Sequence, residues 1–210
     1  MQHESLGVLV AVFFWFSPAL AAGDRPDTME TSENAERAEN KAIILEQKAV
    51  TDDQASSSAT LRTIAKHEAQ AVDPDGEEPL DDAITCLSRT IYWEARGQQT
   101  TEMEAIASVV MNRLNQGDFP NTICNVVKQG NEQGSCQFSW WCDGRPDEAD
   151  EETYTIAKEI ARRALNQQLT DRTQGATFFH HRDTRPDWSM EFIRTSEIGE
   201  HVFYKTDSAK

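Results

Sequence analysis

The sequence predicts a small α+β domain, mainly helical with a short C-terminal antiparallel sheet, preceded by an acidic spacer. Two observations lead to this prediction. Within residues 81–210, helical apolar periodicities come first and short strand-like runs come last. The same stretch holds all four cysteines, all three tyrosines and every tryptophan except Trp15. Its length of about 130 residues is enough to bury one core.

Residues 1–21 have the pattern of a secretory signal peptide. An apolar run from Leu6 to Phe16 is followed by Pro18 and by small residues that suit cleavage after Ala21. The alternative is an uncleaved anchor, but the run is shorter than the ~20 residues that span a bilayer. We therefore expect an exported protein, in the periplasm or on the cell-wall side of the envelope, with no membrane span after signal cleavage.

Residues 22–80 are expected to form a flexible acidic spacer. They carry 14 acidic and 6 basic side chains, with no aromatic residue and no cysteine. Such a composition buries too little apolar surface to offset the entropy of ordering the chain. Short helical patches are possible at 40–50 and 61–71, but the sustained heptads of a coiled coil are absent.

The net charge of the whole chain is −16. Nucleic-acid-binding proteins depend on Lys and Arg to neutralise phosphates, so this balance argues against a nucleic-acid partner. Half of the excess acidity lies in the expected spacer, and it therefore says little about the domain that follows.

The first expected helix of the domain runs over residues 82–95. Asp81 or Asp82 is a suitable N-cap, and Gly97 follows the last helical residue. The next helix is expected to open with a capping box, Thr101 at the N-cap and Glu104 at N3. Its apolar stripe consists of Met103, Ile106, Ala107, Val110, Met111 and Leu114.

The remaining elements are shorter or interrupted. A short helix is expected over 122–128, a loop rich in Gly, Cys and Trp over 130–147, and a third long helix over 151–168. Short strands are expected at 176–180, 192–196 and 201–205.

The four cysteines favour disulfides, because their number is even and the chain has an export signal. They are Cys86, Cys124, Cys136 and Cys142. Three pairings are possible, and the sequence does not choose among them. The alternatives are a zinc site, for which C-x₂-C spacing is absent, and a catalytic thiol acting with His180 or His201.

Glu94 is the candidate catalytic residue. It lies seven residues after Leu87 and three after Ile91, on the apolar stripe at the C-terminal turn of its helix. Desolvation and the negative end of the helix dipole both disfavour a carboxylate there, so we expect its pKa to be raised. A carboxyl group kept protonated in this way can act as a general acid. Pairing with Arg89 or Arg96 is the alternative.

Eight short sequence blocks follow one another over roughly residues 84–204. The blocks are Tyr92–Gly97, Ala105–Ala107, Val109–Arg113, Phe119-Pro120, Cys136–Trp140, Gly175–Thr177, Pro186-x-Trp188 and Ile198-Gly199-x-His201-x-Phe203-Tyr204. In sequence and in order, these blocks resemble the cell wall hydrolase family typified by the spore cortex-lytic enzyme, SleB.

The resemblance implies a lysozyme-like or transglycosylase-like domain that acts on peptidoglycan glycan strands, with Glu94 as the catalytic acid/base. A single Glu suffices for lytic transglycosylation, which leaves 1,6-anhydromuramoyl ends. Hydrolysis becomes possible if a second acid such as Asp143 approaches the cleft. The chain departs from the family where many members have Glu-Pro, here Gln98-Gln99, and where they often have Gly, here Glu102.

Nine further residues are candidates for substrate binding: Tyr92, Arg96, Gln137, Phe138, Ser139, Trp140, His180, Trp188 and His201. Hydroxyl and amide groups can bind sugar hydroxyl or acetamido groups, and aromatic rings can supply apolar faces for sugar rings, although many aromatics are core residues.

A zinc amidase and a non-catalytic peptidoglycan-binding module are the other functions considered. Adjacent His180 and His181 would point to opposite faces of a strand, and no H-E-x-x-H motif is present. We therefore expect no metal. We also expect no cofactor, and the protein is expected to be a monomer.

Overall fold

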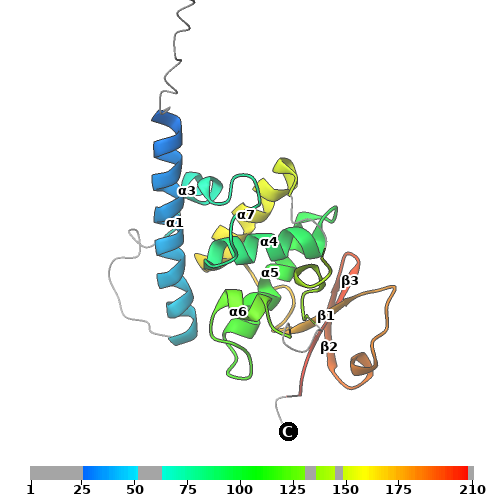
Figure 1. Ribbon diagram of the computed structural model, residues 1–210. Coiled ribbons are helices and arrows are strands. Elements are labelled where there is room, and N and C mark those ends of the chain that lie inside the picture. Colours follow the sequence, from blue (N-terminus) through cyan, green and yellow to red (C-terminus); the bar gives the residue numbers. More distant parts are fainter. Residues whose placement is uncertain (1–25, 52–62, 131–135, 145–148, 208–210) are drawn as a thin grey trace, which may run out of the picture.

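The computed structural model describes residues 26–51, 63–130, 136–144 and 149–207 (Figure 1). A body of helices is followed by a three-stranded antiparallel sheet, which confirms the predicted α+β fold. The helices are α1 (Pro26–Thr51), α3 (Lys66–Ala71), α4 (Ala83–Ala95), α5 (Thr100–Leu114), α6 (Ile123–Val127) and α7 (Glu151–Leu165). In Figure 1, α1 lies along one side of the body and the sheet lies on the other.

Helix α4 is the centre of the helical body, and it packs against α1, α5, α6 and α7. Every side chain from Ala83 to Tyr92 is buried. Asp82 caps the helix as predicted, because its carboxylate accepts a hydrogen bond from the amide of Thr85. Gly97, at a φ of +80°, turns the chain away after the last helical residue.

Helix α5 begins at Thr100, two residues earlier than a helix capped by Thr101 would, and the predicted capping box does not form. Gln99 is the N-cap, and its carbonyl oxygen accepts hydrogen bonds from the amides of Glu102 and Met103. Glu104 instead binds Arg163 of α7 at 2.6 Å. Glu104 therefore joins α5 to α7, although the local sequence pattern assigns its side chain to the capping box.

Helices α1 and α3 differ from the flexible spacer expected over residues 22–80. Ala38, Ala42 and Leu45 form a buried stripe on α1 that packs on the helical body. Small side chains let two helices approach closely, so few apolar groups are needed to cover the contact. The carboxylate of Glu46 also accepts a hydrogen bond from the amide of Ile123, at the first turn of α6.

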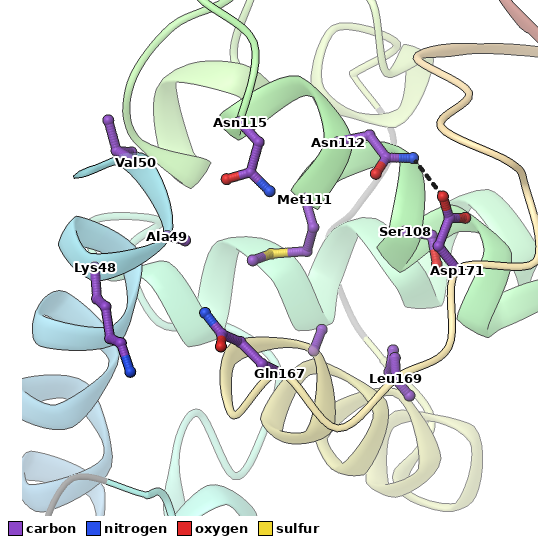
Figure 2. A pocket seen from close by; sticks show the side chains of 11 residues that line it. Lys48, Ala49, Val50, Ser108, Met111, Asn112, Asn115, Gln167, Leu169 and Asp171 are labelled. Atoms are coloured by element: carbon purple, nitrogen blue, oxygen red, sulfur yellow. Dashed lines mark hydrogen bonds between the residues drawn. The ribbon is translucent and has the colours of Figure 1, made fainter. Parts of the chain in front are cut away.

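A hollow of about 800 Å³ lies between the end of α1 and helices α5 and α7 (Figure 2). Lys48, Met111, Asn115 and Gln167 are among the side chains around it. None of the predicted site residues lines this hollow.

Residues 63–80 are held to the helical body by a buried ion pair. The Nε of Arg89 on α4 donates to Asp73 Oδ2 at 2.7 Å, and the hydroxyl of Tyr154 on α7 donates to the same oxygen at 2.6 Å. The amide of Glu78 donates to the other carboxylate oxygen. Asp73 and Arg89 have 0% and 1% of their side-chain surface exposed. The folded unit therefore begins before residue 81, where the sequence placed the start of the domain.

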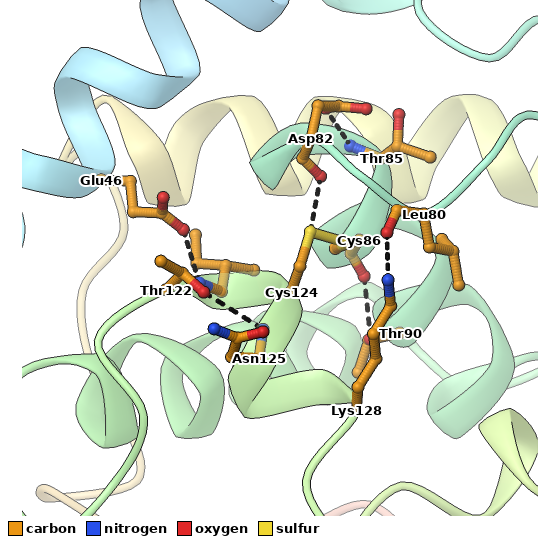
Figure 3. The surroundings of a disulfide bond; sticks show 11 residues. Glu46, Leu80, Asp82, Thr85, Cys86, Thr90, Thr122, Cys124, Asn125 and Lys128 are labelled. Atoms are coloured by element: carbon orange, nitrogen blue, oxygen red, sulfur yellow. Dashed lines mark hydrogen bonds between the residues drawn. A yellow bond between two sulfur atoms is a disulfide. The ribbon is translucent and has the colours of Figure 1, made fainter. Parts of the chain in front are cut away.

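Both disulfides lie in the part predicted to be folded. Cys86 of α4 is bonded to Cys124 of α6, next to the Asp82 cap (Figure 3). Cys136 is bonded to Cys142 and closes a loop that contains the 3-10 turn η2 (Ser139–Trp141). The predicted disulfides are thus present, and all four sulfurs are engaged, which leaves no thiol for a zinc site or a nucleophile.

The sheet has the strand order β1-β3-β2. Its strands are β1 (Phe178–His181), β2 (Ile193–Ile198) and β3 (His201–Lys205), and a second 3-10 turn, η3 (Asp187–Met190), lies between β1 and β2. The observed β1 begins two residues later than expected and β3 has the expected bounds. Helix α7 ends three residues before the expected Gln168, and Gln167 has a φ of +58°.

The predicted signal peptide, residues 1–21, lies outside the described residues, as do residues 22–25 and 52–62 of the expected spacer. Within the described part of the chain, no helix is long and apolar enough to cross a membrane.

Replacing Asp73 with Asn is expected to lower the free energy of unfolding by about 3–5 kcal/mol, because the charge of Arg89 would remain buried without its partner. Urea denaturation followed by circular dichroism measures the change. Asp75→Asn, two residues away and exposed, is the matched control and should shift the free energy by less than about 0.5 kcal/mol. Equal effects of the two substitutions would contradict the proposed importance of the buried pair.

Candidate active site

Glu94 lies in the last turn of α4, where the helix dipole is negative. The residue is half-buried, and its Oε1 atom is buried. The neighbouring Arg96 is exposed. The candidate acid therefore stands at the edge of the helical body, with one carboxylate oxygen shielded from solvent.

Arg113 of α5 is a buried cation close to Glu94. Burial lowers the pKa of Arg113 to about 10, while the nearby carboxylate of Glu94 acts in the opposite direction. The Nε of Arg113 donates to the carbonyl oxygen of Thr177 at 2.7 Å. Its guanidinium carbon lies 5.1 Å from the ring centroid of Phe138 and 5.5 Å from that of Phe178. Arg113 is not among the site residues predicted from the sequence, although it follows Val110 by three residues on a buried face of α5.

A hollow of about 320 Å³ lies beside Arg113, between the 136–142 loop and the sheet. Its lining is mainly aromatic and consists of Arg113, Cys136, Gln137, Phe178, Phe179, Trp188 and Phe192. This volume is at the lower end of the range for ligand pockets. The hollow shown in Figure 2 is larger, but α5 lines it with Ser108, Met111, Asn112 and Asn115. At 100° per residue these positions lie on a different face of the helix from Arg113.

The structure brings three of the predicted substrate-binding residues together at the smaller hollow. Gln137 and Trp188 line it. His180 lies against Trp188, with 5.6 Å between ring centroids, and its Nε2 is 3.1 Å from the hydroxyl of Tyr204. Ser139 is exposed and opens the turn η2 in the same loop as Gln137.

Three predicted substrate-binding residues are internal instead. Tyr92 has 0% of its surface exposed, and its hydroxyl donates to Asp150, the N-cap of α7. Phe138 and Trp140 are also buried in the core. Their rings fill space between elements and do not face solvent, which corrects the prediction that they contact sugar rings. Arg96, in contrast, is exposed, with its guanidinium carbon 5.3 Å from the Tyr92 ring centroid.

His201 is also internal, where it pairs with Glu102. The Nδ1 of His201 lies 2.5 Å from Glu102 Oε1, and the amide of Glu200 donates to the same oxygen at 2.9 Å. The His201 and Glu102 side chains have 7% and 1% of their surface exposed. A Cβ at residue 199 would lie 1.9 Å from Glu102 Oε2, so this carboxylate requires the glycine in the β2–β3 turn. His201 therefore joins the sheet to α5 and does not line the hollow.

Within the described ranges, no group of three or more His, Cys, Asp or Glu side chains is arranged to hold a metal ion. His180 and His201 make the hydrogen bonds given above.

The model of the Cell Wall Hydrolase family matches residues 97–204. This match covers more than half of the chain, including α5, the 136–142 loop and the sheet. The chain belongs to the Cell Wall Hydrolase family. The matched segment begins three residues after Glu94, so the family match covers the hollow and not the helix that carries the candidate acid.

The chain is similar to two curated spore cortex-lytic enzymes. It is 30% identical over 126 residues to a spore cortex-lytic enzyme of Halalkalibacterium halodurans, covering 59% of this chain and 34% of that protein. It is 29% identical over 141 residues to the spore cortex-lytic enzyme of Bacillus subtilis, covering 66% of this chain and 42% of that protein. The matched part of the chain thus spans less than half the length of these relatives.

A solved structure of the same type is also similar. The catalytic domain of the germination-specific lytic transglycosylase SleB from Bacillus anthracis is 28% identical, with a TM-score of 0.50. The likeness covers 63% of this chain and 99% of that domain. The fold of the family's catalytic domain is therefore contained in this chain.

Lowering the pH from 7.5 to 5.5 is expected to destabilise the protein through His201. Burial lowers the pKa of this imidazole from 6.5 and outweighs the opposing effect of Glu102, while His181 lowers it further and Glu200 raises it. The unfolded chain therefore binds the proton first as the pH falls, so the contribution of His201 is present above pH 6.5 and lost below it. Urea denaturation midpoints at the two pH values measure the effect.

His201→Gln is expected to reduce this pH dependence, whereas His67→Gln, at an exposed position, should keep it. An unchanged pH dependence in His201→Gln would assign the effect to other groups.

Proposed function

We propose that the chain is an exported enzyme that cleaves the glycan strands of peptidoglycan, with Glu94 as the general acid and base. The observation that carries the proposal is the position of Glu94, which is half-buried at the end of α4 with Oε1 shielded from solvent. Its carboxylate interacts electrostatically with Arg113, a residue that lines the aromatic hollow. Membership of the Cell Wall Hydrolase family supports the substrate class. The similar Bacillus anthracis domain is named a lytic transglycosylase.

The reaction that we favour is lytic transglycosylation, because it requires one acid/base residue. The carboxyl group of Glu94 donates its proton to the glycosidic oxygen as the bond from that oxygen to C1 of muramic acid breaks. The resulting carboxylate then accepts the proton of the C6 hydroxyl, whose oxygen forms a bond to C1. The product is a 1,6-anhydromuramoyl end, no water is consumed, and Glu94 returns to its protonated form.

Hydrolysis is the second candidate, since a water molecule could replace the C6 hydroxyl if a second carboxylate activated it. Asp143 is exposed at the end of the 136–142 loop, and its amide donates to the carbonyl oxygen of Ser139. Because Asp143 lies at the end of the loop that lines the hollow, it is the candidate general base for hydrolysis.

Export is part of the proposal. The signal-like pattern of residues 1–21 and the two disulfides support an oxidising compartment outside the cytoplasm, such as the periplasm or the cell-wall side of the envelope.

Glu94→Gln is expected to lower the rate of peptidoglycan digestion by about 10²–10⁴-fold, because glutamine cannot donate or accept the proton at this step. Purified peptidoglycan is digested with both proteins, and the soluble fragments are identified by mass spectrometry. Glu159→Gln is the matched control: Glu159 binds Arg162 on the same helix, α7, and its loss should leave the rate within about twofold.

The fragments distinguish the candidate functions. Anhydromuramoyl ends that disappear in Glu94→Gln support transglycosylation, whereas reducing ends indicate hydrolysis. Cleaved peptide stems would indicate an amidase, and binding without fragments a non-catalytic module. Full activity of Glu94→Gln would overturn the assignment of the catalytic residue.

A further inference from the structure

Helix α1 (Pro26–Thr51) lies outside residues 97–204, the segment that matches the family. Its buried stripe consists of the small side chains of Ala38 and Ala42 and one larger residue, Leu45. Because the free energy of apolar burial is roughly proportional to the area removed from water, this stripe contributes only modestly to docking. The charged side chains on the same face therefore have a large influence on how tightly α1 docks.

Glu46 places a carboxyl group inside this contact. Its residue surface is only 9% exposed, and Figure 3 shows its side chain extending from α1 to the first turn of α6, where it accepts the hydrogen bond from the amide of Ile123. Burial raises the pKa of Glu46 and the negative charge of Asp82 raises it further, although the amide of Ile123 acts in the opposite direction. The ionised form of Glu46 is therefore disfavoured while α1 is docked.

Three more carboxyl groups share this environment. Burial raises the pKa of Glu39 on α1, and neighbouring acids, foremost Asp82 and Glu78, raise it further. Burial also raises the pKa of Glu78 and of Asp82, and in both cases the charge of Asp81 acts in the same direction. Docking of α1 thus brings its own carboxylates against the acidic residues 78–82, where like charges repel.

The cations of α1 on this side bind a different carboxylate. Lys41 Nζ lies 2.6 Å and Arg37 Nε lies 3.7 Å from the carboxylate of Glu68 on α3. Although burial acts in the opposite direction, Lys41 holds the pKa of Glu68 below its ordinary value, so this pair stays ionised from pH 7.5 to pH 5.0. Among the described residues, no Lys or Arg forms an ion pair with Glu39 or Glu46.

The other basic side chains on or near the elements packed against α1 are exposed or bind elsewhere. Two are exposed, one donates to the carbonyl oxygen of residue 80, one to those of residues 70 and 72, and one binds a carboxylate on its own helix: Lys48, His67, Lys128, Lys158 and Arg162. The repulsion between α1 and residues 78–82 is therefore relieved by protonation of the carboxylates.

We propose that α1 is a pH-sensitive strap, which docks on the helical body more tightly as the pH falls because Glu46 and Glu39 then meet residues 78–82 without like charges. The disulfide between Cys86 and Cys124 joins α4 to α6. The surface that receives Glu46 is thereby fixed, and α1 is the part that moves. The inference does not depend on the proposed catalytic function.

The sign follows from proton linkage. A carboxyl group whose pKa is raised in the docked state binds its proton at a higher pH than the same group on a released helix, so docking takes up protons. The unfavourable contribution of Glu46 is complete above its raised pKa and is lost below the ordinary value of 4.5. Residues 48–50 of α1 line the larger hollow in Figure 2, so the strap also holds one wall of that hollow in place.

Hydrogen–deuterium exchange of the full chain, followed by mass spectrometry at pH 7.5 and pH 5.0, tests the proposal. Each rate is divided into the intrinsic exchange rate at the same pH. The resulting protection of the α1 amides is expected to be at least about threefold higher at pH 5.0. Amides of α5 are the internal reference, because they report the global change expected from His201. Protection of α1 that is unchanged or lower at pH 5.0 would overturn the proposal without any variant.

Glu46→Gln locates the effect, because the glutamine carbonyl oxygen can still accept from the Ile123 amide and carries no charge at either pH. The variant is expected to raise the protection of α1 at pH 7.5 by at least about twofold and to reduce its pH dependence. Glu30→Gln is the matched control: it removes the same charge from an exposed position of the same helix, and it should keep the wild-type pH dependence. A full pH dependence in Glu46→Gln would contradict the role of Glu46.

Discussion

The buried ion pair between Arg89 and Asp73 is the interaction on which the helical body depends. Helix α4 is covered on nearly every face, so a charged residue in its middle needs a buried partner. Asp73 supplies that partner from outside the expected domain, and Tyr154 joins it through the same carboxylate oxygen. Three separate stretches of chain thereby meet at one carboxylate. Residues 63–80 are therefore an integral part of the body that holds Glu94 at the end of α4.

A second set of contacts joins this body to the sheet. The adjacent residues Asn112 and Arg113 donate to the adjacent carbonyl oxygens of Ala176 and Thr177, just before β1. Glu102, at the other end of α5, holds the β2–β3 turn through His201. Helix α5 thus attaches the sheet at two points. Because Arg113 also lines the aromatic hollow, the contact that docks the sheet also fixes one wall of that hollow.

Local sequence predicted the candidate site only in part. Glu94 and Trp188 were selected from a helical stripe and from motif blocks, and the structure leaves both partly exposed. Tyr92, Phe138, Trp140 and His201 belong to the same motifs, yet they are buried. An aromatic ring has the same signature in sequence whether it packs inside or lines a cleft, because both environments favour a large apolar face. Only the neighbours that tertiary packing supplies separate the two roles.

The sequence by itself determined the order of helices and strands after residue 81, the Asp82 cap of α4 and the stripe that carries Glu94, because these depend on residues within a few positions of one another. It could not determine the cap of α5, the disulfide pairing or the partner of Arg89, since each depends on residues distant in the chain. The acidic N-terminal segment shows the difference most clearly. Its composition predicts a spacer, but Asp73 and the alanine stripe of α1 meet complementary surfaces on the helical body, and only tertiary structure provides those surfaces.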